Sequence, residues 1–199
     1  FSHIETIVKR LALSAFTVGF QLTHNGKTVF ESAAIETELS EQRRVASVLC
    51  DEFMNEALTV ETHSAGLRLS GYVALPVYSR SQADSQYCYI NGRFIRDKLI
   101  SHAMKQAYSD VLFNGRHPAY VIYLECDPAI VDVNVHPTKH EVRFRDSRAI
   151  HGFIRSAVKR ALESVRPTVE QNQMTHDVSA FDEMESHEVA APADVAQSL

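Results

Sequence analysis

The chain has 199 residues, of which 45% are hydrophobic and 23% are charged, a composition typical of a water-soluble globular protein with a substantial core. No apolar stretch approaches the roughly 20 residues that a membrane-spanning helix requires, and the first residues lack the basic-then-apolar order of a secretory signal. These features exclude collagen-like, wholly disordered and transmembrane classes, and they predict a cytoplasmic protein without a membrane partner. Three scattered cysteines are expected to be reduced core residues, namely Cys50, Cys88 and Cys126.

Charge is distributed unevenly along the chain. All 20 Lys and Arg residues lie within residues 1–166, and residues 91–166 carry 13 of them against 8 Asp and Glu. Residues 167–199 carry 7 Asp and Glu, no Lys or Arg and one aromatic side chain, which is too little apolar surface to offset the entropy lost on folding. The sequence therefore predicts a folded domain over residues 1–166 with a basic second half, followed by an acidic disordered linker over residues 167–199.

The first 75 residues predict a helix and a hairpin, then a second helix and hairpin. Ser2 and Glu5 have the spacing of a capping box at the start of a short helix. The apolar residues through which this helix should pack are Ile4, Ile7, Val8 and Leu11. Asn25-Gly26 and Ser64-Ala65-Gly66 predict the two hairpin turns, and a helix is expected over 41–53 between them. None of these segments has a chemical signature, and the polar segment 76–85 is expected to be a solvated connector.

Residues 86–166 contain the patterns with chemical content. We expect a strand over 87–91 that runs through Gly92-Arg93 directly into a helix, whose exposed side carries Lys98, His102 and Lys105. Residues 119–126 are apolar on both faces, which predicts a central strand.

Residues 132–145 predict two strands joined by a stiff turn. Polar residues alternate with valine before the turn at 137–140, which would present Lys139 between the strands. A final amphipathic helix follows, for which Asp146 or Ser147 is the expected cap.

Two strings in this half closely resemble the MutL family of DNA mismatch-repair proteins, within the GHKL ATPase superfamily. They are QYCYINGRFIRD at residues 86–97 and VDVNVHPTKHEVRF at residues 131–144. The resemblance extends over residues 1–166 and implies the second, transducer domain of the family's amino-terminal ATPase region. It implies an α+β fold of the ribosomal-protein-like βαβ type with a left-handed crossover, an exception to the usual handedness, and a mixed sheet with helices packed on one face.

The resemblance also implies which cofactors act and where. The nucleotide-binding half of such proteins contains a catalytic Glu, an Asp-x-Gly-x-Gly segment and a glycine-rich lid, and none of these occurs among the 7 glycines here. We therefore expect this chain alone neither to bind nor to hydrolyse ATP, whereas ATP and Mg would be cofactors of the longer parent, a slow ATPase. In the family, the Lys that corresponds to Lys139 contacts the γ-phosphate of ATP bound in the preceding domain, so that domain orientation follows nucleotide state.

The same turn has other possible interpretations. Without the resemblance, Lys139 would be an ordinary solvated turn residue. Asn134, His136 and Pro137 are expected to fix the turn. His136 and His140 have a spacing that can bind a metal on a helix, but Pro137 and the flanking alternation argue against a helix, so no metal site is expected.

The basic side chains before and along the predicted helix have three possible roles: ordinary solvated faces, an interface with an acidic protein, or contacts to the DNA backbone. The net charge of +5 over residues 91–166 and the resemblance favour DNA, either double- or single-stranded and without sequence preference. The residues expected to bind it are Arg93, Arg96, Lys98 and Lys105. The sequence shows no basic patch interleaved with aromatic residues of the kind that stacks single-stranded bases.

The sequence therefore predicts a transducer domain for DNA mismatch repair. The resemblance implies a homodimeric parent that works with a MutS-type mismatch-recognition protein, a downstream endonuclease and a helicase, associated with the bacterial nucleoid. One alternative is a purely protein–protein interaction module of the repair complex. The other is the equivalent domain of a type II topoisomerase or an Hsp90-like chaperone, which the HPTKHEVRF string disfavours.

Overall fold

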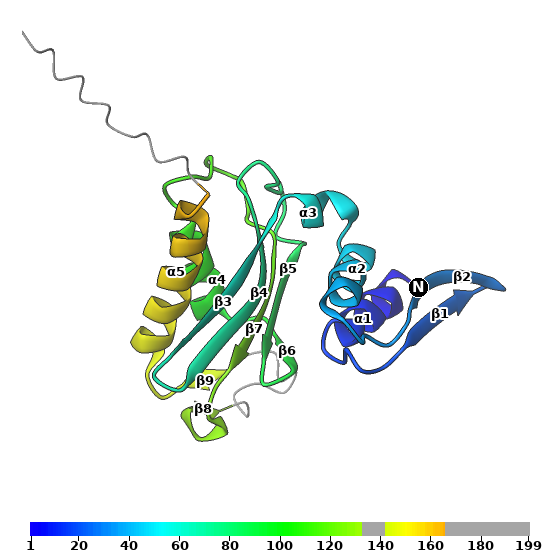
Figure 1. The fold of residues 1–199 in the computed structure, drawn as a ribbon, viewed down its shortest axis with the longest axis horizontal. Helices are drawn as coiled ribbons and strands as arrows, with labels where there is room; N and C mark the ends of the chain where they lie inside the picture. The colour runs from blue at the N-terminus through cyan, green and yellow to red at the C-terminus, as the bar shows by residue number, and fades with distance from the viewer. Residues whose placement is uncertain (133–141, 166–199) are drawn as a thin grey trace, which may run out of the picture. The chain divides into compact units, whose positions relative to one another are not determined.

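The structure is a computed structural model that describes residues 1–132 and 142–165 (Figure 1). The helices are α1 Ser2–Ala12, α2 Glu38–Val48, α3 Asp51–Asn55, α4 Lys98–Ala107 and α5 Ser147–Glu163, with a 3-10 turn η1 at Pro128–Ile130. The longer strands are β1 Phe20–His24, β2 Lys27–Ser32, β3 Ala57–Ser64, β4 Leu67–Ala74, β5 Gln86–Ile90 and β7 Tyr120–Glu125. Three short strands complete the set, namely β6 Arg93–Ile95, β8 Val131–Asp132 and β9 Arg143–Phe144.

The central sheet has five strands in the order β3-β4-β7-β5-β6. Its neighbours are antiparallel except β5 and β7, which are parallel and are connected through β6 and α4. A parallel pair cannot be joined by a tight turn, so this connection has to cross over the sheet. The mixed sheet with its helices confirms the predicted α+β class, and the left-handed sense of the crossover stays a prediction from the resemblance.

Side chains alternate between the two faces of the sheet, and each face has its own core. On one face, α4 and α5 pack over the sheet as expected, and the centre of this core includes Leu69, Ile122, Leu124, Met104 and Ile154. The other face is covered by the amino-terminal segments, which the sequence did not predict (Figure 1). Their core with the sheet includes Leu13, Val45, Phe53, Tyr89 and Val121. The apolar strand over 119–126 is confirmed as a central strand, because it is buried on both faces.

The first helix packs differently from the prediction. Phe1 occupies the N-cap position without a side-chain hydrogen bond, so the predicted capping box does not form. Most of the predicted packing stripe is exposed, at 55% for Ile4 and 50% for Leu11. Of the predicted stripe, Val8 is half-buried against the core, and the closest packing is at the carboxyl end, where Ala12 and Leu13 are buried and the Leu13 carbonyl accepts from Tyr123.

The tight turns follow the sequence, with one that the prediction missed. Asn25-Gly26 and Ala65-Gly66 have the positive φ angles expected of two-residue hairpin turns, so both hairpins are confirmed. Asn91-Gly92 has the same geometry, and it turns the chain back into β6 instead of leading directly into a helix. The helix predicted over 41–53 is also wrong as one element, since α2 ends at Val48 and α3 begins at Asp51.

The remaining predictions divide between confirmed and untested. Asp146 caps α5 by accepting a hydrogen bond from the Ala149 amide at 2.9 Å, as one of the two proposed caps. The three cysteines are free thiols, two of them buried and Cys50 half-buried. Within the described residues, no helix has the length and hydropathy that crossing a membrane requires. The linker predicted over 167–199 lies outside the described residues.

Candidate nucleic-acid interface

The four cations predicted to bind DNA lie along one continuous stretch of chain that includes β6 and α4. Arg93 begins β6, Arg96 follows its end, Lys98 begins α4 and Lys105 lies in its last turn. All four side chains are exposed. In the part of the chain that the structure describes, none of them forms an ion pair, whereas other surface cations such as Arg68 do. Their charges are therefore available to an anionic ligand.

Local structure sets the positions of these cations. The Asn91-Gly92 turn directs Arg93 back along the edge of the sheet. Asp97 then caps α4, since its carboxylate accepts from the Leu99 amide at 2.8 Å and the Ile100 amide at 3.4 Å. Because seven residues make two turns of a helix, Lys98 and Lys105 lie on the same side of α4.

Arg10 lies close to this surface, and sequence reasoning did not find it. The guanidinium of Arg10 stacks over the ring of Phe94 in β6 at 4.3 Å from the centroid. Partial burial, and then the nearby charge of Arg96, lowers the pKa of Arg10. Its Nε is buried without a hydrogen-bond partner among the described residues. No local sequence pattern could have shown that Arg10 lies beside Phe94 and Arg96, because more than 80 residues separate it from both.

A hollow of about 360 Å³ lies beside two of these cations. Its lining residues include Gln86, Arg96, Lys98, Ser101 and Tyr120. Burial raises the pKa of the Tyr120 hydroxyl still further above physiological pH. Neutral hydroxyl and amide groups next to cations are the groups that commonly contact phosphate oxygens.

The predicted γ-phosphate sensor, Lys139, lies outside the described residues, as do Asn134, His136, Pro137 and His140. The structure describes both ends of the segment that contains them. Val131 pairs with Phe144 and Asp132 pairs with Arg143, so β8 and β9 bring these ends together as predicted. Among the described residues, no group of three or more His, Cys, Asp or Glu side chains could bind a metal ion.

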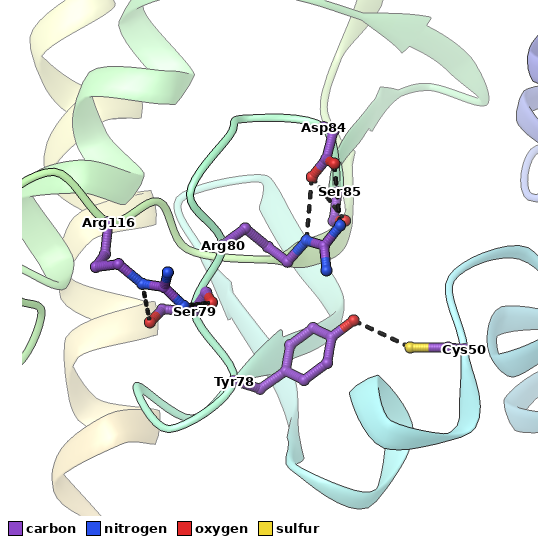
Figure 2. Close-up of polar contacts among 7 residues, drawn as sticks. All are labelled: Cys50, Tyr78, Ser79, Arg80, Asp84, Ser85 and Arg116. Atoms are coloured by element: carbon purple, nitrogen blue, oxygen red, sulfur yellow. Dashed lines mark hydrogen bonds and ion pairs between the residues drawn. The ribbon is translucent and has the colours of Figure 1, made fainter.

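The segment predicted as a connector, 76–85, is irregular but makes specific contacts (Figure 2). Arg80 binds Asp84 through two hydrogen bonds of 3.2 and 3.0 Å. The hydroxyl of Tyr78 lies 3.0 Å from the Cys50 sulfur, and burial with this contact raises the pKa of Tyr78 to about 12. This polar segment is thus fixed against its neighbours, and it holds residues 116–117, which line a second hollow beside α4.

Comparisons with known proteins agree with this fold. The profile of the family described as "DNA mismatch repair protein, C-terminal domain" matches residues 45–163, more than half of the chain. The chain belongs to the MutL family of DNA mismatch-repair proteins. The MutL proteins of Cellvibrio japonicus (strain Ueda107) and Pseudomonas paraeruginosa (strain DSM 24068 / PA7) are 58% and 56% identical to it over 167 residues, which is 84% of this chain. The chain spans 27% and 26% of the length of these two MutL relatives.

Solved structures show the same fold at low sequence identity. The amino-terminal domain of a DNA repair protein has a TM-score of 0.67 and 18% identity, over 82% of this chain and 53% of that one. The Aquifex aeolicus MutL ATPase domain complexed with ADP has a TM-score of 0.50 and 16% identity, over 79% of this chain and 46% of that one. Membership of the MutL family decides against the topoisomerase and chaperone alternatives.

Proposed function

We propose that this chain acts in DNA mismatch repair as the transducer domain of a MutL-type ATPase, with a DNA-binding surface formed by Arg93, Arg96, Lys98 and Lys105. The observation that carries the DNA proposal is that four exposed cations lie along one stretch of chain without an ion pair among the described residues. Such cations bind DNA by displacing counterions from phosphates, which gives affinity without sequence preference. Arg10 adds a fifth positive charge near Arg96.

Salt dependence tests the DNA proposal. Binding of a labelled duplex to the 199-residue chain, measured by fluorescence anisotropy, should weaken steeply between about 50 and about 200 mM salt. Lys98→Glu should weaken it further and reduce the slope of log affinity against log salt by about 0.9 for each phosphate that Lys98 neutralises. Lys27→Glu makes the same charge change on the exposed β1–β2 hairpin and serves as the matched control.

Two results would contradict this surface. If affinity is indifferent to salt and to Lys98→Glu, the alternative of a purely protein–protein interaction module is favoured. If Lys27→Glu weakens binding as much as Lys98→Glu does, net charge and not this surface explains the affinity.

We also propose that Lys139 contacts the γ-phosphate of ATP and Mg bound in the domain that precedes this one in the parent. Support comes from the family motif and from the β8–β9 pairing, which anchors the segment: the Arg145 amide donates to the Ile130 carbonyl at 2.9 Å, and Phe144 is buried. A charge-assisted contact of about 1.5–3 kcal/mol would change nucleotide occupancy or turnover by about 10- to 100-fold. This chain alone would neither bind nor hydrolyse ATP.

ATP turnover by the longer MutL parent tests the sensor. Lys139→Ala should depress hydrolysis in a protein that contains the ATP-binding domain, while Lys27→Ala should not. Unchanged turnover in Lys139→Ala would remove the sensor role and leave the DNA proposal intact. We propose that the parent is a homodimer in the cytoplasm, associated with the nucleoid. Its partners would be a MutS-type mismatch-recognition protein, a downstream endonuclease and a helicase.

A further inference from the structure

A second hollow lies at the other end of α4 and has no role in the function proposed so far. Its volume is about 380 Å³, and it is lined by His102, Lys105 and Gln106 of α4 and by residues 108–109 and 112–118. Phe113 lines it and is 87% exposed, the highest exposed fraction among the large apolar side chains in the described residues. A phenyl ring at such exposure has no core role, so it is available for contact with a ligand.

One wall of this hollow is fixed by contacts with the segment that contains Ser79 and Arg80 (Figure 2). The Nε of Arg116 donates to the Ser79 hydroxyl at 3.0 Å, and a second guanidinium nitrogen donates to the Ser79 carbonyl. The backbones of Arg80 and His117 exchange two hydrogen bonds, at 2.9 and 2.7 Å. Arg116 is therefore oriented by neutral oxygens, and its positive charge is not neutralised by a carboxylate among the described residues.

The α4 part of the lining includes Lys105, which also belongs to the proposed DNA surface. The carboxylate of Asp110, which is not among the lining side chains, is bound by Lys159 at 3.0 Å. The side-chain amides of Gln106 and Asn114 add hydrogen-bond donors and acceptors to the lining. The hollow thus combines an exposed aromatic ring, amide groups and two cations.

We propose that this hollow binds an unpaired base of single-stranded DNA, which stacks on Phe113 while Lys105 and Arg116 contact the flanking phosphates. The combination of an aromatic platform with adjacent cations suits single strands, because every base offers a face for stacking and every nucleotide carries a phosphate. A base within a duplex is already stacked on its neighbours and cannot reach the ring. The inference rests on the proposed DNA-binding function and assigns a base-stacking site to it, at Phe113.

The test compares three labelled DNAs that bind the 199-residue chain: a single strand of about 16 nucleotides, its duplex and an abasic single strand of the same length. Phe113→Ala should weaken binding of the normal single strand by roughly tenfold or more, since stacking accounts for that much affinity per base. The same variant should leave the duplex and the abasic strand within about twofold of their original affinities. Phe113→Tyr, which keeps a stacking ring, should restore single-strand binding.

Phe1→Ala is the matched control, because it removes another exposed phenyl ring, and it should leave all three affinities unchanged. The inference fails if Phe113→Ala leaves single-strand affinity unchanged, which is also the result expected if the hollow binds an acidic protein segment. It fails equally if single strand and duplex lose the same affinity. These failures are distinct from failure of the proposed function, which would show as duplex binding indifferent to Lys98→Glu.

Discussion

The two faces of the central sheet are stabilised in different ways. The face covered by α4 and α5 is buried against regular helices whose own backbone groups are hydrogen-bonded, and its core is almost entirely apolar. The face covered by the amino-terminal segments is crossed by turns and helix ends, whose carbonyls have no partner within the local backbone. There, buried polar side chains supply the missing donors. Buried carbonyls in irregular chain need such donors or ordered water.

Arg44 is the main donor on the amino-terminal face. Its side chain is 1% exposed, and it bonds only to neutral oxygens within the described residues. The acceptors are the carbonyls of Ala12, Ala15, Val18 and Ala33 and the hydroxyl of Ser32. Burial lowers the pKa of Arg44, and these oxygens replace the water around its charge. One side chain therefore connects α1, the following loop, β2 and α2.

The largest expected effect tests this polar side. Arg44→Met should lower the free energy of unfolding by about 3–5 kcal/mol, because several buried carbonyls lose their donor at once. Urea denaturation monitored by circular dichroism measures the change. Arg155→Met, an exposed arginine on α5, is the control and should change stability by no more than about 0.5 kcal/mol. If Arg44→Met lowers the free energy of unfolding by no more than the control does, buried donors are not what stabilises the amino-terminal face.

An intermediate effect is expected on the apolar side. Ile154 on α5 is fully buried against the sheet, and its side chain is wholly apolar. Ile154→Ala should lower the free energy of unfolding by about 2–4 kcal/mol, because apolar burial decreases and a cavity is left behind. Ile154→Val should cost about 1 kcal/mol in the same urea experiment. If Ile154→Ala and Ile154→Val lower the free energy of unfolding equally, the size of the cavity does not determine the stability lost.

The smallest effect at neutral pH concerns Tyr72, whose hydroxyl donates to Glu41 at 3.3 Å on the amino-terminal face. Burial first, and then the charge of Glu41, raises the pKa of Tyr72 from 10.0 to about 12. Between these values the folded state binds more protons than the unfolded state, so stability should fall as pH rises from about 10 to about 12. Tyr72→Phe should cost about 0.5–1 kcal/mol at pH near 8 and make that alkaline fall shallower. If the free energy of unfolding falls equally steeply with pH in the original protein and in Tyr72→Phe, the raised pKa of Tyr72 does not contribute to the alkaline loss of stability.

Sequence patterns predicted the parts of the fold that depend on neighbours in the chain. The Asn25-Gly26 and Ala65-Gly66 turns, the strand over 119–126 and the cap at Asp146 were all correct, since each depends on residues a few positions apart. The prediction that failed at Asn91-Gly92 ignored a turn pattern that was present. The failure of the α1 stripe has a different origin, because helical spacing shows which residues share a face but not what lies against it.

The candidate site shows the same division. The family motif and the charge of residues 91–166 identified Arg93, Arg96, Lys98 and Lys105, and the structure shows that they are exposed. Lys139 remains a proposal from the motif, since it lies outside the described residues. The sequence did not associate Phe113 with Lys105 and Arg116, because these residues come together through the contacts of two loops.

The sequence by itself determined the family, the Asn25-Gly26 and Ala65-Gly66 hairpins, the central strand and the basic character of the second half, because these depend on residue types and short spacings. Only the tertiary structure decided which charges stay unpaired, which ring remains exposed beside them and how Arg44 satisfies the irregular segments. The physical reason is that burial and charge pairing depend on residues brought together from distant parts of the chain, and composition or periodicity carries no information on those contacts.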